Sequence, residues 1–431
     1  MTLSINKINR KMLTRCIDHL RYENKVLKAR LIECGKRIDE EQGGDDDNNT
    51  SINTPPSTPY TPSIRLSASG DNVFTTRGSE DSHTWWTGGV TCMVYCPQLD
   101  TFLVAGNGTI NGANVRSGYF DTTTNKIVPD SADNCLKHGG FVGAAYGGGD
   151  IMLVGYASSQ GGTAFTNNPG MSAYLTINKN NTWKWTIPAK NDGGLPLNKD
   201  WYAVAYGKKK FIAVASGAND TYKNNNDTAL VDGKNDSATI AYSLDHKTWQ
   251  FVDTPNGFYY AGIAFGNDKF IAVCTQRGSD STISSIATSS DGITWDFKTN
   301  ASTYSTTTWN SVAYNSKLNV FIAVQYEPYA CTVIDANSFN KISDINASRI
   351  RMPYIWSTEE ENPSFIYGSM DQSSDISNNG LGLIQGAISN NLNLSGVLNN
   401  NGLPITLAIS SDGICLYSTG NAIIQLAGPS S

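Results

Sequence analysis

The sequence has little charge and few residues of the types that most often perform chemistry. Of its 431 residues 16% are charged and four are histidines. The histidines are scattered, at His19, His83, His138 and His246. No Ser-His-Asp arrangement, phosphate-binding loop or zinc-ligand spacing can be recognised in it. These absences argue against the common hydrolase, nucleotide-binding and zinc-binding classes, so we expect no catalytic residues, metal or cofactor.

Long apolar runs and paired cysteines are also missing. No segment is apolar enough over the length needed to cross a bilayer, and the start, MTLSINKINRKML, has charges where a secretory signal has an apolar core. The eight cysteines show no paired spacing, which fits synthesis in a reducing compartment. A net charge of -6 argues against a nucleic-acid-binding surface. We expect neither membrane insertion nor nucleic-acid binding.

The sequence is rich instead in a repeated phrase of two apolar strands around a short polar turn. The clearest copy is WYAVAYGKKKFIAVAS at 201–216, and residues 259–275 and 309–325 follow it closely. Looser copies lie at 90–106, 141–156 and 353–369. One reference aromatic residue in each copy gives intervals of 42 to 60 residues, which is the period of propeller blades.

Outer hairpins between these phrases complete four-stranded units. They are expected at 118–128, 174–185, 238–251, 284–297, 331–343 and 381–397. Residues 403–418 resemble a seventh inner pair, and residues 63–76 an outer hairpin standing before the first. Joining the two chain ends in one sheet would close a ring. The sequence therefore predicts an all-β propeller over residues 63–431, with seven blades favoured and six as the alternative.

A short acidic turn recurs in the outer hairpins, as SSDGITWDF at 289–297 and YSLDHKTWQF at 242–251. Its shared positions are Ser243, Asp245 and Trp249 in one copy and Ser289, Asp291 and Trp295 in the other. Ser and Asp can supply a nucleophile, a base or oxygen ligands. Because one active site does not recur in several blades, repetition favours a structural role.

These turns resemble the Asp-box, or BNR, repeats of sialidase-type β-propellers. The preceding Val-Ala-Tyr-Gly and Phe-Ile-Ala-Val phrases resemble repeats in fibre and surface proteins of phages and large DNA viruses. The resemblance covers roughly residues 63–431. It implies that the Asp and hydroxyl groups bond to their own turn and that the Trp is buried, at the periphery of the ring.

The resemblance implies that a sialidase-like activity would also require an arginine triad, and the propeller region contains few arginines. Only Arg351, in Ile350-Arg351-Met352-Pro353, faintly matches the family's Arg-Ile-Pro motif. That motif normally precedes the first acidic turn, whereas Arg351 follows the clear ones. A sialidase-like glycoside hydrolase therefore remains an alternative function only.

The first 62 residues differ in character from the repeats. Residues 1–39 carry a heptad pattern typical of a parallel leucine zipper, which predicts a homo-oligomer, dimer or trimer, with residues 1–12 available to dock onto other virion proteins. The seam residues are Leu13, Ile17, Leu20, Asn24, Leu27, Leu31, Cys34 and Ile38. Residues 40–62, acidic and then rich in Pro, Ser and Thr, read as an extended linker.

One insertion concentrates oxygen ligands. Residues 217–238 contain Asp220, Asp227, Asp232 and Asp236, which would suit calcium. Their spacing does not match an EF-hand loop, and a solvated insertion between strands explains the same composition. We favour the solvated insertion and leave calcium open.

A zipper, a linker and a propeller head together suit a protein that presents several copies of one binding face. The first hypothesis is a non-catalytic virion structural or attachment protein at the particle surface, whose head binds a host glycan or protein. Flat rings stack on sugars or anchor interfaces, so the candidate contacts are rim aromatics. They are Trp85, Trp86, Tyr222, Tyr259, Tyr260, Tyr326 and Tyr329. Besides the glycosidase, an intracellular propeller scaffold is the second alternative.

Overall fold

The computed structural model divides the chain into two compact units, Met1–Ser57 and Thr58–Ser431. All of the described residues lie in the second unit. They are residues 63–66, 90–106, 115–121, 126–136, 140–155, 171–178, 181–189, 192–196, 199–218, 238–276, 278–304, 307–325, 330–346, 350–351, 354–358, 364–371, 380–385, 388–392, 406–410, 415–418 and 423–427. The predicted heptad helix and linker fall outside them, and no helix within them is long and apolar enough to span a bilayer.

Five antiparallel sheets follow one another directly along the chain. The first two comprise β2 (Val90–Cys96), β3 (Thr101–Gly106), β4 (Ser117–Asp121) and β5 (Lys126–Pro129), then β6 (Phe141–Gly147), β7 (Asp150–Gly155), β8 (Ser172–Ile177) and β9 (Trp183–Thr186). The next two comprise β10 (Lys199–Gly207), β11 (Lys210–Ala218), β12 (Ile240–Ser243) and β13 (Gln250–Val252), then β14 (Tyr259–Gly266), β15 (Lys269–Gln276) and β16 (Ile286–Ser289). The fifth comprises β17 (Ser311–Asn315), β18 (Val320–Val324), β19 (Ala330–Asp335) and β20 (Lys341–Asn346).

Two further sheets complete the set of seven formed by the described residues. One comprises β21 (Ile350–Arg351), β22 (Ile355–Thr358), β23 (Ser364–Asp371), β24 (Gly380–Gln385) and β25 (Ile388–Leu392). The other joins the ends of the unit, in the order β1 (Ser63–Leu66), β28 (Ile423–Ala427), β27 (Cys415–Ser418) and β26 (Thr406–Ile409). Its register sets Ile64 opposite Leu426, so the predicted closure by the two chain ends is present.

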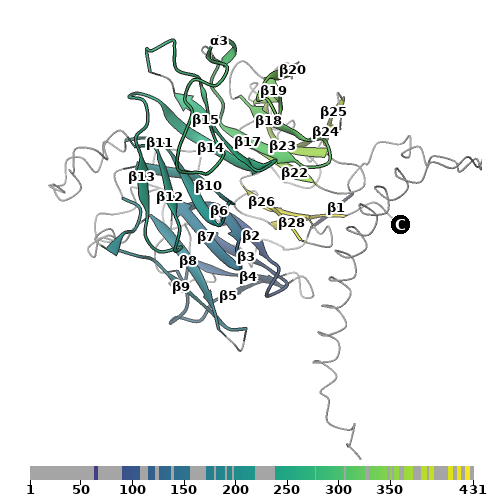
Figure 1. The fold of residues 1–431 in the computed structure, drawn as a ribbon. Helices are drawn as coiled ribbons and strands as arrows, with labels where there is room; N and C mark the ends of the chain where they lie inside the picture. Colours follow the sequence, from purple (N-terminus) through teal and green to yellow (C-terminus); the bar gives the residue numbers. More distant parts are fainter. Residues whose placement is uncertain are drawn as a thin grey trace, which may run out of the picture. The chain divides into compact units, whose positions relative to one another are not determined.

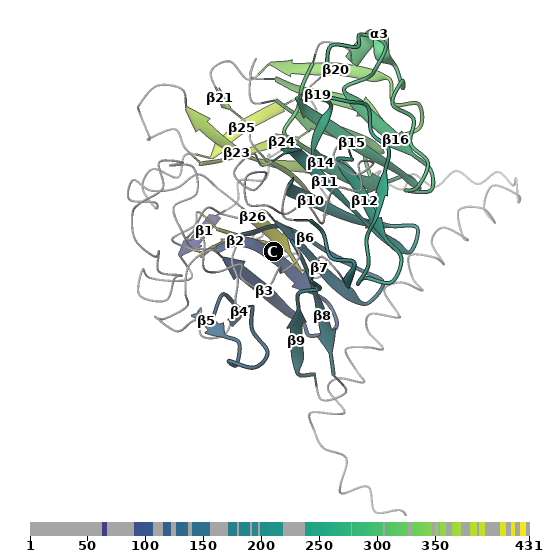
Figure 2. The same ribbon diagram turned by 90° about the vertical axis from the view of Figure 1, so that its left-hand side faces the viewer.

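The innermost strands of the sheets lie beside one another in a fixed order. In the series β26, β2, β6, β10, β14, β17 and β22, each strand contacts the next. Figures 1 and 2 both place β26 between β2 and β23, where the ends of the propeller unit meet. This is the arrangement of a β-propeller, and its seven sheets agree with the favoured count rather than with six.

One predicted outer hairpin is only half present. Over residues 284–297, β16 is a strand, but the following segment makes a single bridge, between Thr288 and Asp296. The Asp296 carboxylate accepts hydrogen bonds from Lys298 N at 2.7 Å and Thr299 Oγ1 at 2.8 Å. This local turn directs the chain into the short helix α3 (Ala301–Tyr304) and ends the pairing.

Close packing between inner strands explains the repeated aromatic-Gly pair of the sequence. A Cβ atom on Gly147 would lie 2.0 Å from Tyr206 Cγ, and one on Gly207 would lie 2.4 Å from Phe265 Cγ. Gly266 stands in the same relation to Tyr314, at 2.0 Å. Each ring therefore occupies the space above the glycine of the preceding sheet, which only a residue without a side chain leaves open. We call this contact the aromatic-Gly interlock.

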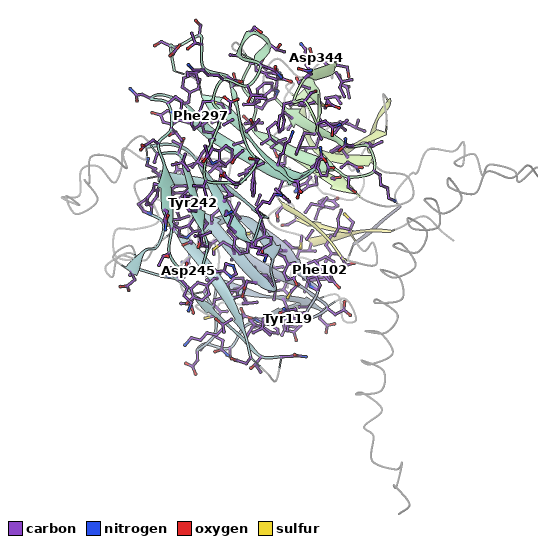
Figure 3. All side chains as sticks on the ribbon, viewed as in Figure 1. Phe102, Tyr119, Tyr242, Asp245, Phe297 and Asp344 are labelled. Atoms are coloured by element: carbon purple, nitrogen blue, oxygen red, sulfur yellow. The ribbon has the colours of Figure 1, made fainter. Side chains whose placement is uncertain are left out.

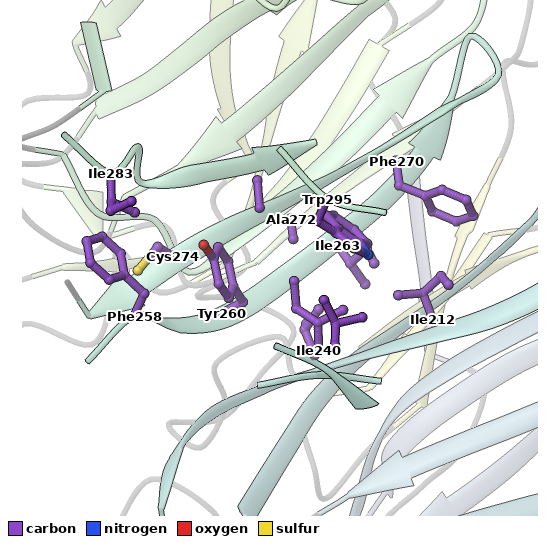
Figure 4. Packing of buried hydrophobic residues seen from close by; sticks show 13 residues of the cluster. Ile212, Ile240, Phe258, Tyr260, Ile263, Phe270, Ala272, Cys274, Ile283 and Trp295 are labelled. Atoms are coloured by element: carbon purple, nitrogen blue, oxygen red, sulfur yellow. The ribbon is translucent and has the colours of Figure 1, made fainter. Parts of the chain in front are cut away.

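The hydrophobic core lies between consecutive sheets. Figure 4 shows Ile212 and Ile240 of one sheet facing Ile263, Phe270 and Trp295 of the next. Their exposed fractions range from 0% to 9%. The inner strands are thus covered on both faces, which accounts for their nearly continuous apolar sequences. The six described cysteines are buried and form no disulfide with one another.

Candidate functional site

The turn at Asp245, between β12 and β13, uses its carboxylate to hold its own backbone. The carboxylate accepts hydrogen bonds from Lys247 N at 2.9 Å, Thr248 N at 2.7 Å and Thr248 Oγ1 at 2.8 Å. Slight burial acts to raise the pKa of Asp245, but these bonds outweigh it and lower the pKa to about 2. Asp245 lies at the outside of its sheet (Figure 3).

Asp291 makes the same turn in the next sheet. Its carboxylate accepts from Ile293 N at 2.8 Å and Thr294 N at 2.7 Å, and Ser289 Oγ lies 3.0 Å away. Slight burial opposes the shift, yet the pKa of Asp291 is lowered by these bonds. Its oxygens are therefore engaged in hydrogen bonds within their own turn.

A third such turn, after β19, was missed by the sequence analysis. Asp335 accepts hydrogen bonds from Ser338 N and Ser338 Oγ, both at 2.8 Å, and from Asn337 N at 3.0 Å. These bonds lower the pKa of Asp335. Because this copy has Phe339 instead of a Trp, only the Asp and a hydroxyl residue three positions later remained as a signal. We call the turns at Asp245, Asp291 and Asp335 the acidic turns.

The tryptophans of the acidic turns are buried. Trp249 is 6% exposed, and its indole Nε1 donates to Ser172 Oγ on β8 of the preceding sheet at 3.0 Å. Trp295 is 9% exposed and donates to the carbonyl oxygen of Gly292 within its own turn at 3.3 Å. One ring thus links two sheets, and the other stabilises its own turn.

Each acidic turn also contacts the preceding sheet at one equivalent position, the first residue of the second inner strand. The contacts are His246 Nδ1 to Asp150 Oδ2 at 2.6 Å, Lys210 Nζ to the Asp291 carbonyl oxygen at 2.7 Å, and Lys269 Nζ to the Asn337 carbonyl oxygen at 2.6 Å. The acidic turns therefore fasten neighbouring sheets together.

A buried carboxylate that the sequence analysis did not single out joins the first two sheets. Asp130 accepts from Ser117 Oγ at 2.6 Å, Trp183 Nε1 at 2.9 Å and Trp185 Nε1 at 3.1 Å. Burial raises the pKa of Asp130, although these three donors act to lower it. Asp130 lies outside the repeated motif, so no sequence pattern indicated this role.

A cavity of about 400 Å³, wide open to solvent, lies where the inner strands β26, β2 and β6 meet. It is lined by Met93, Val94, Tyr95, Pro97, Ala144, Ala145, Tyr146, Leu407, Ala408, Ile409 and Ser410. These side chains are apolar or neutral. The hydroxyl of Tyr95 donates to Asp100 Oδ1 at 2.6 Å, outside the lining. Such a site can hold an uncharged group by shape and apolar contact.

The structure describes two of the seven predicted rim aromatics and corrects one of them. Tyr260 is 0% exposed and packs in the core between β10–β13 and β14–β16, so it is not a rim contact. Tyr259 is half-buried at the start of β14. The periodic position of Tyr260, equivalent to Trp201 and Trp309, was the signal for a core role.

The remaining predicted contacts lie outside the described residues. They are Trp85, Trp86, Tyr222, Tyr326, Tyr329, the heptad residues and Asp220, Asp227, Asp232 and Asp236 of the acidic insertion. Within the described part of the chain, no three His, Cys, Asp or Glu side chains gather in a group that could hold a metal ion.

Solved structures similar to the chain include several β-propeller proteins. YCF48 from Cyanidioschyzon merolae has a TM-score of 0.50 and 7% identity, covering 85% of this chain and 98% of its own. Streptogramin B lyase has a TM-score of 0.48 and 13% identity, with 85% and 97% covered. YCF48 bound to D1 peptide has a TM-score of 0.46 and 12% identity, with 88% and 100% covered.

At these identities the likeness extends to the fold alone. No family model and no curated protein sequence matches the chain.

Proposed function

We propose that the protein is a non-catalytic binding protein of a virus particle surface, with the propeller as its head and the heptad segment joining several copies. The observation that carries this proposal is the use of the acidic turns: their carboxylates hold their own backbone, and the turns fasten the preceding sheet. The repeats then serve as a scaffold, and recognition of a host glycan or protein belongs to the loops and openings of the ring.

Several copies on one stalk would compensate for a weak individual contact. Linking binding modules raises the overall affinity by about 10²–10⁴ without any new contact. The proposal therefore predicts that attachment depends on the heptad seam as well as on the head.

A host-cell binding assay with the full chain tests this dependence. The double variant Leu20→Asp/Leu27→Asp charges the seam, and we expect apparent affinity to fall about 100-fold with a loss of oligomers in light scattering. Ala29→Asp, outside the seam, is the matched control and should bind like the wild type. Equal binding by the monomeric variant would contradict the multivalent role.

Two further measurements address location and catalysis. Mass spectrometry of purified particles should detect the protein at stoichiometric levels, and its confinement to the soluble host extract would favour the scaffold alternative. A fluorogenic sialoside should not be hydrolysed. Turnover that Arg351→Ala abolishes would replace the binding proposal with the glycosidase.

A further inference from the structure

The cavity lies where the repeat departs from its own close packing. In three consecutive pairs of sheets the aromatic-Gly interlock fills the end of the inner strands. The pairs are Gly147 with Tyr206, Gly207 with Phe265, and Gly266 with Tyr314. At the sheets that line the cavity, the corresponding residues are changed.

The changes affect both partners of the interlock. The glycine position of β2 is Cys96, and β26 ends in Ile409 and Ser410 where other repeats have an aromatic residue and glycine. In the interlock, a Cβ atom on Gly147 would lie 2.0 Å from Tyr206 Cγ, and Cys96 has such a Cβ atom at the equivalent position. Tyr146 therefore cannot lie over Cys96 as Tyr206 lies over Gly147, and the space between the strands is not closed in the same way.

The lining of this space selects a chemical class of ligand. Met93, Leu407 and Ile409 supply apolar surface, Tyr95 and Tyr146 supply rings, and none of the described lining side chains is charged. A charged ligand would gain no counter-charge from these described side chains. A volume of about 400 Å³ lies within the range of small-molecule sites.

We propose that this cavity binds a small uncharged molecule that contains an aromatic ring. The ring would pack between Tyr95 and Tyr146 against the apolar side chains of β2 and β26. The site goes beyond the proposed attachment function, because it belongs to the end of the inner strands and does not depend on the heptad seam or on a host surface.

Indole is a suitable probe, since it is neutral, aromatic and small. In the full chain with ¹³C-methyl-labelled methionine, indole should shift the Met93 methyl signal in a saturable way. Met152 and Met171 are buried in another cluster and should not respond. The cation tryptamine should bind at least tenfold more weakly than indole. A Met93 signal unmoved at millimolar indole, or equal shifts at all three methionines, would overturn the proposal.

Filling the cavity provides a second test. Ala145→Leu and Val94→Phe should each weaken indole binding at least tenfold in calorimetry. Ala205→Leu is the matched control, because Ala205 has the same strand position in β10 without lining the cavity. Thermal unfolding identifies which variants fold. If neither Ala145→Leu nor Val94→Phe folds, the response of the wild-type methionine signals to indole tests the proposal. Undiminished binding by a folded filled variant contradicts this site alone and leaves the attachment proposal standing.

Discussion

At the scale of single residues, the same side chain type serves opposite purposes in this protein. The carboxylates of the acidic turns are near solvent and accept backbone N–H bonds, which lower the pKa of Asp245, Asp291 and Asp335. Burial instead raises the pKa of Asp130. As the pH falls, Asp130 should therefore take up a proton first, whereas the acidic turns keep their charge and lose their stabilising contribution only at lower pH.

Replacement of Asp245 tests this in a pH-dependent way. Asp245→Ala should reduce the free energy of unfolding at pH 7 by about 1–2 kcal/mol, because the hydrogen bonds to a charged acceptor are lost. The pKa of Asp245 is lowered to about 2 in the folded chain, so its contribution is full above the unfolded value of about 3.9. The difference between variant and wild type should shrink as the pH falls from about 4 towards 2.

Urea unfolding at several pH values measures this difference. Asp253 is exposed and directly follows β13 of the same sheet. Asp253→Ala is therefore the control and should change the stability little at any pH. A constant difference between pH 7 and pH 2 would show that the Asp245 carboxylate is not the stabilising group.

At the scale of elements, the sequence pattern predicted the inner hairpins well and the outer ones less well. Seven apolar pairs with polar turns identified β2–β3, β6–β7, β10–β11, β14–β15, β17–β18, β22–β23 and β26–β27. These strands are covered on both faces, so their composition is dictated by burial alone. Outer strands depend on local hydrogen bonds, and Asp296 shows how one such set ends a strand.

The candidate site was less predictable for a physical reason. A cavity arises from what neighbouring sheets fail to fill, and Cys96 or Ile409 acquires this meaning only when its partner strand is known. The error at Tyr260 has another origin, since its repeat position, equivalent to Trp201 and Trp309, already indicated the core. The missed turn at Asp335 is similar, because its sequence retained the Asp and hydroxyl spacing.

The aromatic-Gly interlock gives a prediction for a pair of elements. Gly207→Ala places a Cβ atom 2.4 Å from Phe265 Cγ and should destabilise the fold by about 1–3 kcal/mol through overpacking. In the double variant Gly207→Ala/Phe265→Ala, the added cost of the alanine should largely disappear. Denaturant unfolding of all four proteins measures the coupling, and additive effects would mean that the ring does not meet the glycine.

At the scale of the whole propeller unit, closure depends on four residues far from the rest of their sheet in sequence. Ser63–Leu66 pair with Ile424–Ala427, and β26 of that sheet lies against β2 of the first. Without β1, the last sheet keeps three strands and β28 becomes an unprotected edge.

Deletion of residues 63–66 from the full chain should therefore lower the Tm by several degrees and raise amide exchange in β27 and β28 first. Deletion of residues 45–48, four residues of the predicted linker, is the matched control and should leave both quantities unchanged. The effect should spread to β2 afterwards, because β26 packs on β2 across the junction. Equal Tm values for the two deletions would mean that the ring is held by the contacts of β26 alone, with β1 adding a strand but no closure.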